Sequence, residues 1–361
     1  MRVLHLYRPR LPGIRAQAIQ VVHVCEALAR AGHTVTLLAD RGPGATTPAD
    51  ALRALGLEPH PRFDLRLAPV AQPGLAGLWF RAMVQAWMAG PPGLVLARDK
   101  RRLVAAVGPR GRHAVALEAH ELDSALATER GEDAAPVRAL EAAALARADL
   151  LIANCGGTLA AWEDAWGPAL PRVRGVLHNA IAPSRARPDP RETAPVVLGA
   201  GSLRAMKGIG PALRAAADAG LAVHWIGGDA DERAALGALP ATVHLRPALP
   251  YPEVPEHLAA ARVLLVPLMD NRFGRALTSP LKVWDALATP RPVVTPDLPT
   301  MREIAERTGA PFFFHPPGDA AALAAAVRAA AAAPPRTAIV RTWDQRQAEL
   351  DALLAAAGVG P

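Results

Sequence analysis

The sequence predicts an α/β protein of two doubly wound halves that face each other across a cleft. Short apolar runs alternate with amphipathic helical segments, which is typical of parallel strands joined by crossover helices. This alternation stops in a Pro- and Arg-rich stretch at residues 173–191, which we interpret as a linker, and then starts again. A chain of 361 residues is also longer than one ordinary hydrophobic core requires. We therefore expect two domains and place them at residues 1–185 and 186–338, with a final helix at 339–361 that returns to the first domain.

Each element follows from the same two patterns. The first half has apolar runs expected to form strands at residues 3–7, 33–40, 94–99, 115–121, 149–155 and 173–181, with a helix at 18–32. The second half has expected strands at residues 195–202, 222–229, 242–247, 263–268 and 291–296, with helices at 210–220 and 253–261. The last amphipathic segment, residues 344–358, predicts the returning helix.

Charge and composition narrow the possible partners. Lys and Arg number 40 against 33 Asp and Glu, so a net charge of +7 favours anionic partners. Nucleic acid is disfavoured because the basic residues are scattered and aromatic residues make up only 4%, too few for a stacking platform. Cys25 and Cys155 match no metal-binding spacing, so we expect buried thiols in a reducing compartment and no metal.

The apolar stretches do not predict a membrane-spanning protein. The first ten residues are too short an apolar run for a signal peptide, and the apolar stretch after Gly74 is interrupted by Arg81. Trp79, Trp87 and their neighbours fall near helical spacing, which fits either a helix facing the core or an amphipathic helix on a membrane surface. We expect a cytoplasmic protein, with peripheral contact to the inner membrane face left open.

The segment SPLKVWDALATPRPVVTP, which begins at Ser279, predicts a short helix followed by an apolar strand. Ser279 suits the N-cap and Pro280 the first helical position. Lys282 does not fit, because the partial positive charge of a helix start disfavours a cation. A bound anion would remove this conflict. We therefore predict a diphosphate site formed by Ser279, Lys282 and the backbone of Pro280 and Leu281.

Asp285 extends this predicted site. It lies three residues beyond Lys282 and so neighbours it on the helix surface, where a carboxylate could accept hydrogen bonds from sugar hydroxyls. The alternative interpretation is a capped surface helix with a solvated lysine.

The order of several short motifs suggests a family. In chain order these are PRLPGIRAQ, EALARAGHTV, LEAHEL, VLHNAI, GAGSLRAMKG, VLLVPL and SPLKVWDALATPRPVVTPDLP. Over nearly its whole length the chain resembles family 4 glycosyltransferases of the GT-B fold, which have two Rossmann-like domains. The resemblance implies sugar transfer from a nucleotide-sugar donor, UDP-linked by default, with retention at the anomeric carbon and with no metal or cofactor. It also implies that the first domain binds the acceptor and the second the donor.

The resemblance assigns roles to further residues. Lys207 and Lys282 match the basic residues that hold the donor phosphates, which is chemically reasonable because a metal-free site needs fixed cations for the departing diphosphate. Ser202 lies in the same phosphate motif as Lys207. His120 resembles the active-site histidine that contacts the donor sugar, although a hydrogen-bonded loop histidine is the alternative. Gly13 corresponds to the glycine-bearing loop through which the backbone approaches substrate.

The chain also departs from the family pattern. Ser202 stands where many relatives have an arginine, a charge that Arg204 or Arg275 could replace. Leu277 and Asp285 stand where the family has paired glutamates. These departures leave two alternatives to a glycosyltransferase with a hydroxyl acceptor: a non-catalytic GT-B partner subunit, or a GT-B epimerase or hydrolase of nucleotide sugars.

Overall fold

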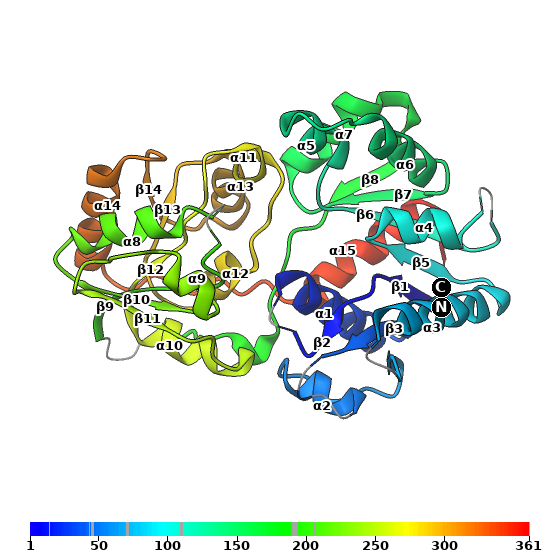
Figure 1. Ribbon diagram of the computed structural model, residues 1–361, viewed down its shortest axis with the longest axis horizontal. Coiled ribbons are helices and arrows are strands. Elements are labelled where there is room, and N and C mark those ends of the chain that lie inside the picture. The colour runs from blue at the N-terminus through cyan, green and yellow to red at the C-terminus, as the bar shows by residue number, and fades with distance from the viewer. Residues whose placement is uncertain are drawn as a thin grey trace. The chain divides into compact units, whose positions relative to one another are not determined.

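The chain folds into two compact units. The computed structural model describes residues 1–13, 15–42, 44, 47–69, 72–108, 111–189, 194–204 and 207–360 (Figure 1). The first unit comprises Met1–Asn179 and Trp343–Pro361, and the second comprises Ala180–Thr342. Among the described residues, no helix is both long and apolar enough to cross a membrane.

The first unit is built on a parallel sheet. Within the described residues, eight strands pair in the order β2-β3-β1-β5-β6-β7-β8, with β4 beside β3. The strands are β1 (Arg2–Leu6), β2 (Arg10–Leu11), β3 (Thr34–Arg41), β4 (Phe63–Leu67), β5 (Leu94–Ala97), β6 (Ala114–Ala119), β7 (Leu150–Ala153) and β8 (Val173–Val176). The helices are α1 (Ala16–Arg30), α2 (Pro48–Arg53), α3 (Pro73–Ala89), α4 (Lys100–Ala106), α5 (Asp123–Glu129), α6 (Ala135–Leu145), α7 (Gly156–Trp166) and α15 (Trp343–Ala356).

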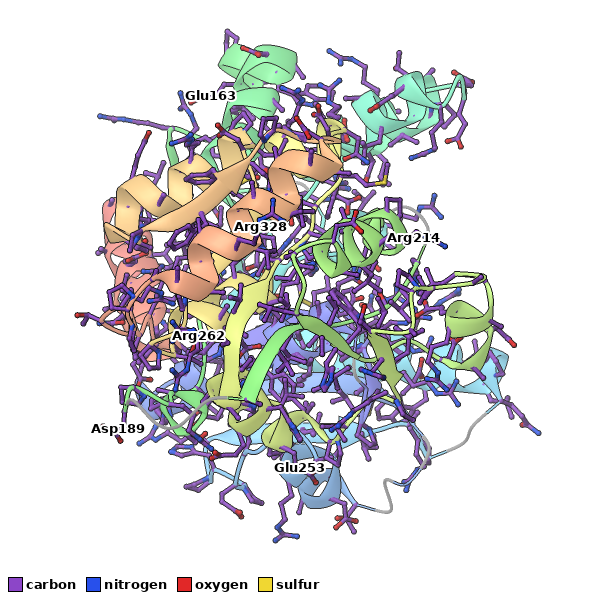
Figure 2. The ribbon with its side chains drawn as sticks, turned by 90° about the vertical axis from the view of Figure 1, so that its left-hand side faces the viewer. Glu163, Asp189, Arg214, Glu253, Arg262 and Arg328 are labelled. Carbon is purple, nitrogen blue, oxygen red and sulfur yellow. The ribbon has the colours of Figure 1, made fainter. Side chains whose placement is uncertain are left out.

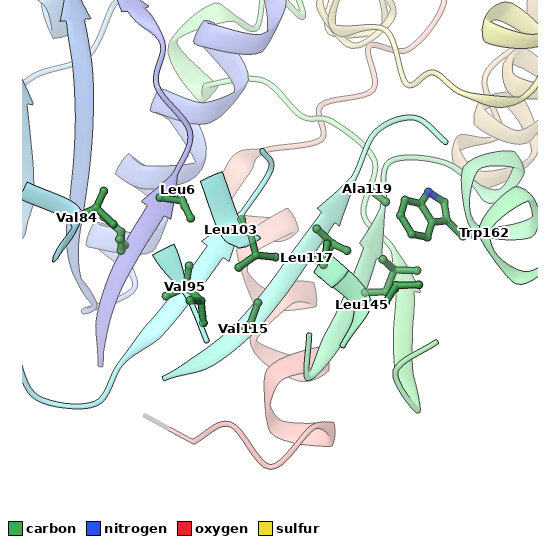
Figure 3. Packing of buried hydrophobic residues seen from close by; sticks show 14 of the residues in the cluster. Leu6, Val84, Val95, Leu103, Val115, Leu117, Ala119, Leu145 and Trp162 are labelled. Carbon is green, nitrogen blue, oxygen red and sulfur yellow. The ribbon is translucent and has the colours of Figure 1, made fainter. Parts of the chain in front are cut away.

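Continuous apolar runs explain the central strands of this sheet. Every residue of β5 and β7 is buried, as expected for strands covered by helices on both faces. Figure 3 shows part of one resulting core, a cluster that includes Val95 and Leu117 from the strands, Leu145 of α6 and Trp162 of α7.

The second unit has the strand order of a Rossmann fold. Its described strands pair in parallel in the order β11-β10-β9-β12-β13-β14, which is the 3-2-1-4-5-6 arrangement. They are β9 (Ala194–Ala200), β10 (Ala222–Ile226), β11 (Val243–Arg246), β12 (Ala261–Leu265), β13 (Val293–Pro296) and β14 (Phe312–His315). The helices are α8 (Ile209–Ala217), α9 (Ala230–Ala234), α10 (Val254–Ala260), α11 (Arg272–Ala276), α12 (Leu281–Leu287), α13 (Pro299–Thr308) and α14 (Ala320–Ala332). The strand order reverses between β9 and β12, which is the topological switch point of the sheet. In such sheets ligands bind at the carboxyl ends of the two strands on either side of that point.

Arginines satisfy backbone carbonyl groups around the second unit (Figure 2). Arg214 of α8 donates to the Leu236 carbonyl at 2.7 Å, and Arg262 of β12 donates to that of Ala331 at 2.7 Å. Arg328 of α14 donates to the Asp218 carbonyl at 3.1 Å. These three arginines therefore have a structural role in the second unit.

The structure differs from the sequence expectation at the linker. Residues 173–176 of the expected linker form strand β8 of the first sheet, in agreement with the strand also expected at 173–181. Arg185 is 4% exposed and bound within the second unit, so the first unit ends at Asn179 and not at the predicted residue 185. The second unit continues to Thr342, past the predicted 338, because Ile181 pairs with Thr342. Residues 190–193 of the expected linker lie outside the described residues.

Two other expectations can be compared with the structure. Cys25 and Cys155 are both fully buried, as predicted. Helix α3 buries Phe80, Val84 and Trp87 in the core of the first unit, so the core-facing interpretation of this segment is correct for that side of the helix.

Gly199 is required where β9 packs against an aromatic side chain. A Cβ atom at this position would lie 2.2 Å from the buried indole ring of Trp225. We expect Gly199→Ala to destabilise the second unit by about 1–3 kcal/mol, the usual cost of overpacking a core. Chemical denaturation measures the change. Gly74→Ala is the control, because nothing lies within 4 Å of its added carbon; equal stability of the two variants would contradict this account.

Candidate active site

Two lysines lie at the topological switch point of the second sheet, between β9 and β12. Lys207 follows β9, and its Nζ donates to Ser202 Oγ at 2.7 Å. Lys282 of α12 donates to the carbonyl oxygen of Pro267, just after β12, at 2.8 Å. Both ammonium groups are therefore held by residues that follow the two central strands, where a Rossmann sheet binds ligands. Residues 205–206 of the same loop lie outside the described residues.

Their surroundings lower the pKa values of both lysines. Among the described residues, neither ammonium group forms an ion pair with a carboxylate. Desolvation lowers the pKa of Lys207 and the nearby Arg204 lowers it further, whereas Glu232 opposes the shift. Burial lowers the pKa of Lys282 to about 7, and the Lys207 ammonium adds to the effect. Two cations close enough to lower a pKa favour an anion as ligand.

The start of α12 differs in detail from the prediction. The helix begins at Leu281, and Pro280, not Ser279, occupies the N-cap position without a side-chain hydrogen bond. The Ser279 hydroxyl instead accepts a hydrogen bond from the Trp284 indole at 3.2 Å. Ser279 is 3% exposed and Leu281 is 8% exposed, so both side chains are packed into the unit.

Asp285 has a partner that the sequence did not suggest. Arg185 Nε donates to Asp285 Oδ1 at 2.8 Å, with 4% and 12% of the two side chains exposed. The Arg185 guanidinium also stacks on the Tyr251 ring, 3.5 Å from its centroid. Asp285 lines a small hollow together with Lys282 and the ends of β9 and β12. One carboxylate oxygen of Asp285 is thus used by the fold, and the hollow places this residue beside the lysines.

The departures from the family pattern have structural explanations. Leu277 is fully buried and belongs to the core. Arg204 and Arg275, the suggested replacements for the missing phosphate-binding arginine, face Glu232 and Asp270 respectively and are more than half exposed.

The remaining candidates, His120 and Gly13, lie in the first unit. His120 follows β6 and is largely buried, with its Nε2 atom 3.6 Å from Glu118 Oε2. Burial lowers the pKa of His120 to about 4; Arg98 lowers it further, whereas Glu118 opposes the shift. Gly13 has a structural requirement of its own, because a Cβ atom would lie 2.5 Å from the Arg10 carbonyl oxygen.

Sequence reasoning missed the cluster that surrounds His120. Glu118 is 2% exposed and accepts hydrogen bonds from Gln20 of α1 at 2.9 Å and from Arg346 of α15 at 2.5 Å. Arg98, after β5, donates to the same Gln20 side chain. Burial alone raises the pKa of Glu118, but His120 and Arg346 together lower it well below its usual range. Polar residues in otherwise apolar strands were the available signal, since His5 of β1 and Glu118 of β6 both interrupt such runs.

Comparison with family models places the chain. The model described as Glycosyltransferase Family 4 matches residues 17–185, and the model described as Glycosyl transferases group 1 matches residues 194–332. A comparison with curated proteins finds no match.

Several solved structures share the fold. Sucrose-phosphate synthase from Thermosynechococcus elongatus is similar with a TM-score of 0.70 at 18% identity, covering 99% of this chain and 96% of that one. WaaG, a glycosyltransferase involved in lipopolysaccharide biosynthesis, gives 0.62 at 16% identity, covering 100% and 96%. An alpha,alpha-trehalose-phosphate synthase (UDP-forming) from Burkholderia vietnamiensis gives 0.59 at 14% identity, covering 99% and 96%.

The two parallel α/β units and these structural neighbours define a two-domain, Rossmann-like GT-B fold. Within that class, the chain belongs to the family 4 glycosyltransferases.

The buried pair of Arg346 and Glu118 gives a stability prediction. We expect Arg346→Met to destabilise the protein by about 3–5 kcal/mol, because it leaves the Glu118 charge buried and unpaired. Adding Glu118→Gln should recover part of that loss, since the unpaired charge is then removed. Chemical denaturation of the single and double variants measures both effects.

A matched control is a second ion pair that also involves α15. Arg30 of α1 pairs with Asp344 of α15 at 2.5 Å, but the two side chains are 35% and 54% exposed. Arg30→Met should cost no more than about 1 kcal/mol, as is usual for exposed ion pairs. Equal losses for Arg30→Met and Arg346→Met would contradict the role of burial.

Proposed function

We propose that the protein transfers a sugar from a nucleoside-diphosphate sugar, by default a UDP-sugar, to a hydroxyl acceptor with retention of configuration. The observation that carries the proposal is the pair of Lys207 and Lys282 at the topological switch point of the second sheet, where neither ammonium group forms an ion pair with a described carboxylate. The related alpha,alpha-trehalose-phosphate synthase is described as UDP-forming, which supports the choice of base. The resemblance to family 4 supports retention.

The two lysines suit the leaving group of this reaction. When the bond between the anomeric carbon and the diphosphate breaks, negative charge develops on the diphosphate oxygens. Fixed cations in a partly desolvated site stabilise that charge. The acceptor oxygen forms the new bond to the anomeric carbon, and its proton passes to the departing diphosphate.

The other candidate residues have supporting roles in this proposal. Ser202 positions Lys207 through their hydrogen bond. The backbone around Pro280 and Leu281, with Ser279, carries Lys282, and Asp285 offers its second carboxylate oxygen to sugar hydroxyls. In the first unit, His120 contacts the donor sugar and the Gly13 loop approaches the substrate. No cofactor or metal is required, because the lysines supply the positive charge.

Proton uptake tests the donor site. At pH 8 Lys282, with a pKa of about 7, is mostly neutral, whereas a bound diphosphate would favour its protonated form. UDP binding at pH 8 should therefore take up about one proton, since its phosphate, with a pKa of about 6, is already deprotonated. At pH 6 the uptake by Lys282 should disappear. Calorimetry in buffers of different ionisation enthalpy measures the uptake.

Substitution assigns that proton to a residue. Lys282→Met should abolish the uptake at pH 8 and weaken UDP binding at pH 6 by about 10- to 100-fold, the value of one charged hydrogen bond. Arg328→Met on α14 removes a cation elsewhere in the unit and should change neither quantity. Unchanged UDP affinity in Lys282→Met would reject the assignment, and absence of UDP, GDP, ADP and TDP binding by the wild type would favour the partner-subunit alternative.

We also propose peripheral contact with an anionic membrane surface at the cytoplasmic face. Leu75 and Leu78 at the start of α3 are 51% and 61% exposed and lie close in sequence to the exposed Arg81. Vesicles containing anionic lipid should retain the wild type at low salt and release the variant Leu75→Ser/Leu78→Ser. Equal retention of both proteins, or none of either, would contradict membrane contact through α3.

A further inference from the structure

Glu118 is fixed at one oxygen by two donors from different helices. It is the penultimate residue of β6, and its Oε1 atom accepts from Gln20 Nε2 of α1 at 2.9 Å and from Arg346 of α15 at 2.5 Å. Arg98 donates a hydrogen bond to the Oε1 atom of the same Gln20 side chain. The carboxylate is therefore held by a strand and two helices of the first unit and has little freedom to rotate.

The second oxygen of Glu118 faces two histidine rings. Its Oε2 atom lies 3.6 Å from His120 Nε2 and 3.9 Å from His5 Nε2. All three atoms are buried, and none has a hydrogen-bond partner among the described residues. A buried anionic oxygen at these distances attracts an N–H group and repels a nitrogen lone pair. The geometry therefore favours a proton on Nε2 of His120.

The environment also keeps His120 neutral. Burial, with Arg98 nearby, lowers the pKa of His120 to about 4, and burial does the same for His5. A neutral imidazole has one protonated nitrogen and one lone pair. If Nε2 carries the proton, Nδ1 carries the lone pair, and Nδ1 of His120 makes no hydrogen bond to any described residue.

We propose that Glu118 is a positioning residue that holds His120 in its Nε2-protonated tautomer, so that Nδ1 is presented as a hydrogen-bond acceptor to a sugar hydroxyl of the donor. The sugar ligand in this inference rests on the proposed function, whereas the tautomer does not. His120 acts as a neutral acceptor and orients the sugar, and Gln20 and Arg346 act through Glu118.

Histidine nitrogen spectra test the tautomer directly. In ¹⁵N-labelled wild-type protein, His120 should show a protonated Nε2 and an unprotonated Nδ1 throughout pH 6–8, with its signals assigned by their loss in His120→Asn. In Glu118→Gln the two nitrogens should become more alike, because an amide can face the ring with either its oxygen or its NH₂ group. A wild-type proton on Nδ1 would overturn the proposal, as would unchanged His120 signals in folded Glu118→Gln.

A buried glutamate in the same unit provides the control. Glu141 is fully buried, and its Oε1 atom accepts from the Ser124 backbone N–H at 3.0 Å. Glu141→Gln should leave the His120 signals unchanged. If Glu118→Gln does not fold, the wild-type spectrum still decides the tautomer and so still supports or overturns the proposal.

Two replacements of His120 test the acceptor atom. The amide of asparagine reaches the position of Nδ1, whereas that of glutamine reaches the position of Nε2 and points at Glu118. With UDP-glucose as the probe, His120→Asn should release UDP about tenfold faster than His120→Gln, with little change in KM, as expected for one neutral hydrogen bond. Equal or faster release by His120→Gln would overturn the acceptor role. If the wild type releases no UDP from any donor sugar, the proposed function fails, but the nitrogen spectra still test Glu118.

Discussion

The ion pair between Arg346 and Glu118 joins the end of the chain to the sheet formed by its beginning. Arg346 is the fourth residue after Thr342, where the second unit ends, and its guanidinium is buried against β6. Either charge would be costly to bury alone. The first unit can therefore fold with these charges paired only when α15 is in place. Because Glu118 also faces His120 and His5, the same interaction positions the polar groups at the carboxyl edge of this sheet.

The polar cluster around Glu118 and the lysine pair of the second unit differ in how their charges are paired. In the first unit one oxygen of the Glu118 carboxylate accepts hydrogen bonds from two helices, and one of these donors is the Arg346 guanidinium. In the second unit Lys207 and Lys282 lie at the topological switch point of the sheet, and neither forms an ion pair with a described carboxylate. Charge balanced within the protein positions its neighbours, whereas charge left unbalanced favours a ligand of opposite sign.

The sequence predicted the architecture well because parallel strands and crossover helices have strong local patterns. It did not predict β4 or β14, which are both short. Strand β4 pairs with β3 outside the main strand order of the first sheet, and β14 is an edge strand of the second sheet. Lys282 was identified because its charge conflicts with a helix start, and the structure indeed places it at the carboxyl end of β12. The predicted start of this helix was wrong. The Ser279 hydroxyl accepts a hydrogen bond from Trp284, so the position of Ser279 in the sequence did not identify the N-cap.

Long-range partners were beyond sequence reasoning. Arg185 lies 100 residues from Asp285, in a stretch whose composition resembles a linker, and nothing local indicates that it is buried. Arg346 and Glu118 are 228 residues apart, and each looks like an ordinary charged residue in its own segment. Such pairs depend on which elements the fold brings together, and hydrophobic periodicity does not encode that choice.

The departures from the family pattern do not by themselves favour a binding-only protein. Leu277 is part of the core, so the missing glutamate leaves no polar gap that the fold must fill. Asp285 still presents a carboxylate beside Lys282, although one of its oxygens is held by Arg185. The lysines bear more directly on the question. Burying Lys282 near Lys207, with no described carboxylate in ion-pair contact with either ammonium group, costs stability, and a protein that only bound a partner elsewhere would gain nothing from it. That cost is understandable if a diphosphate is the missing counter-ion.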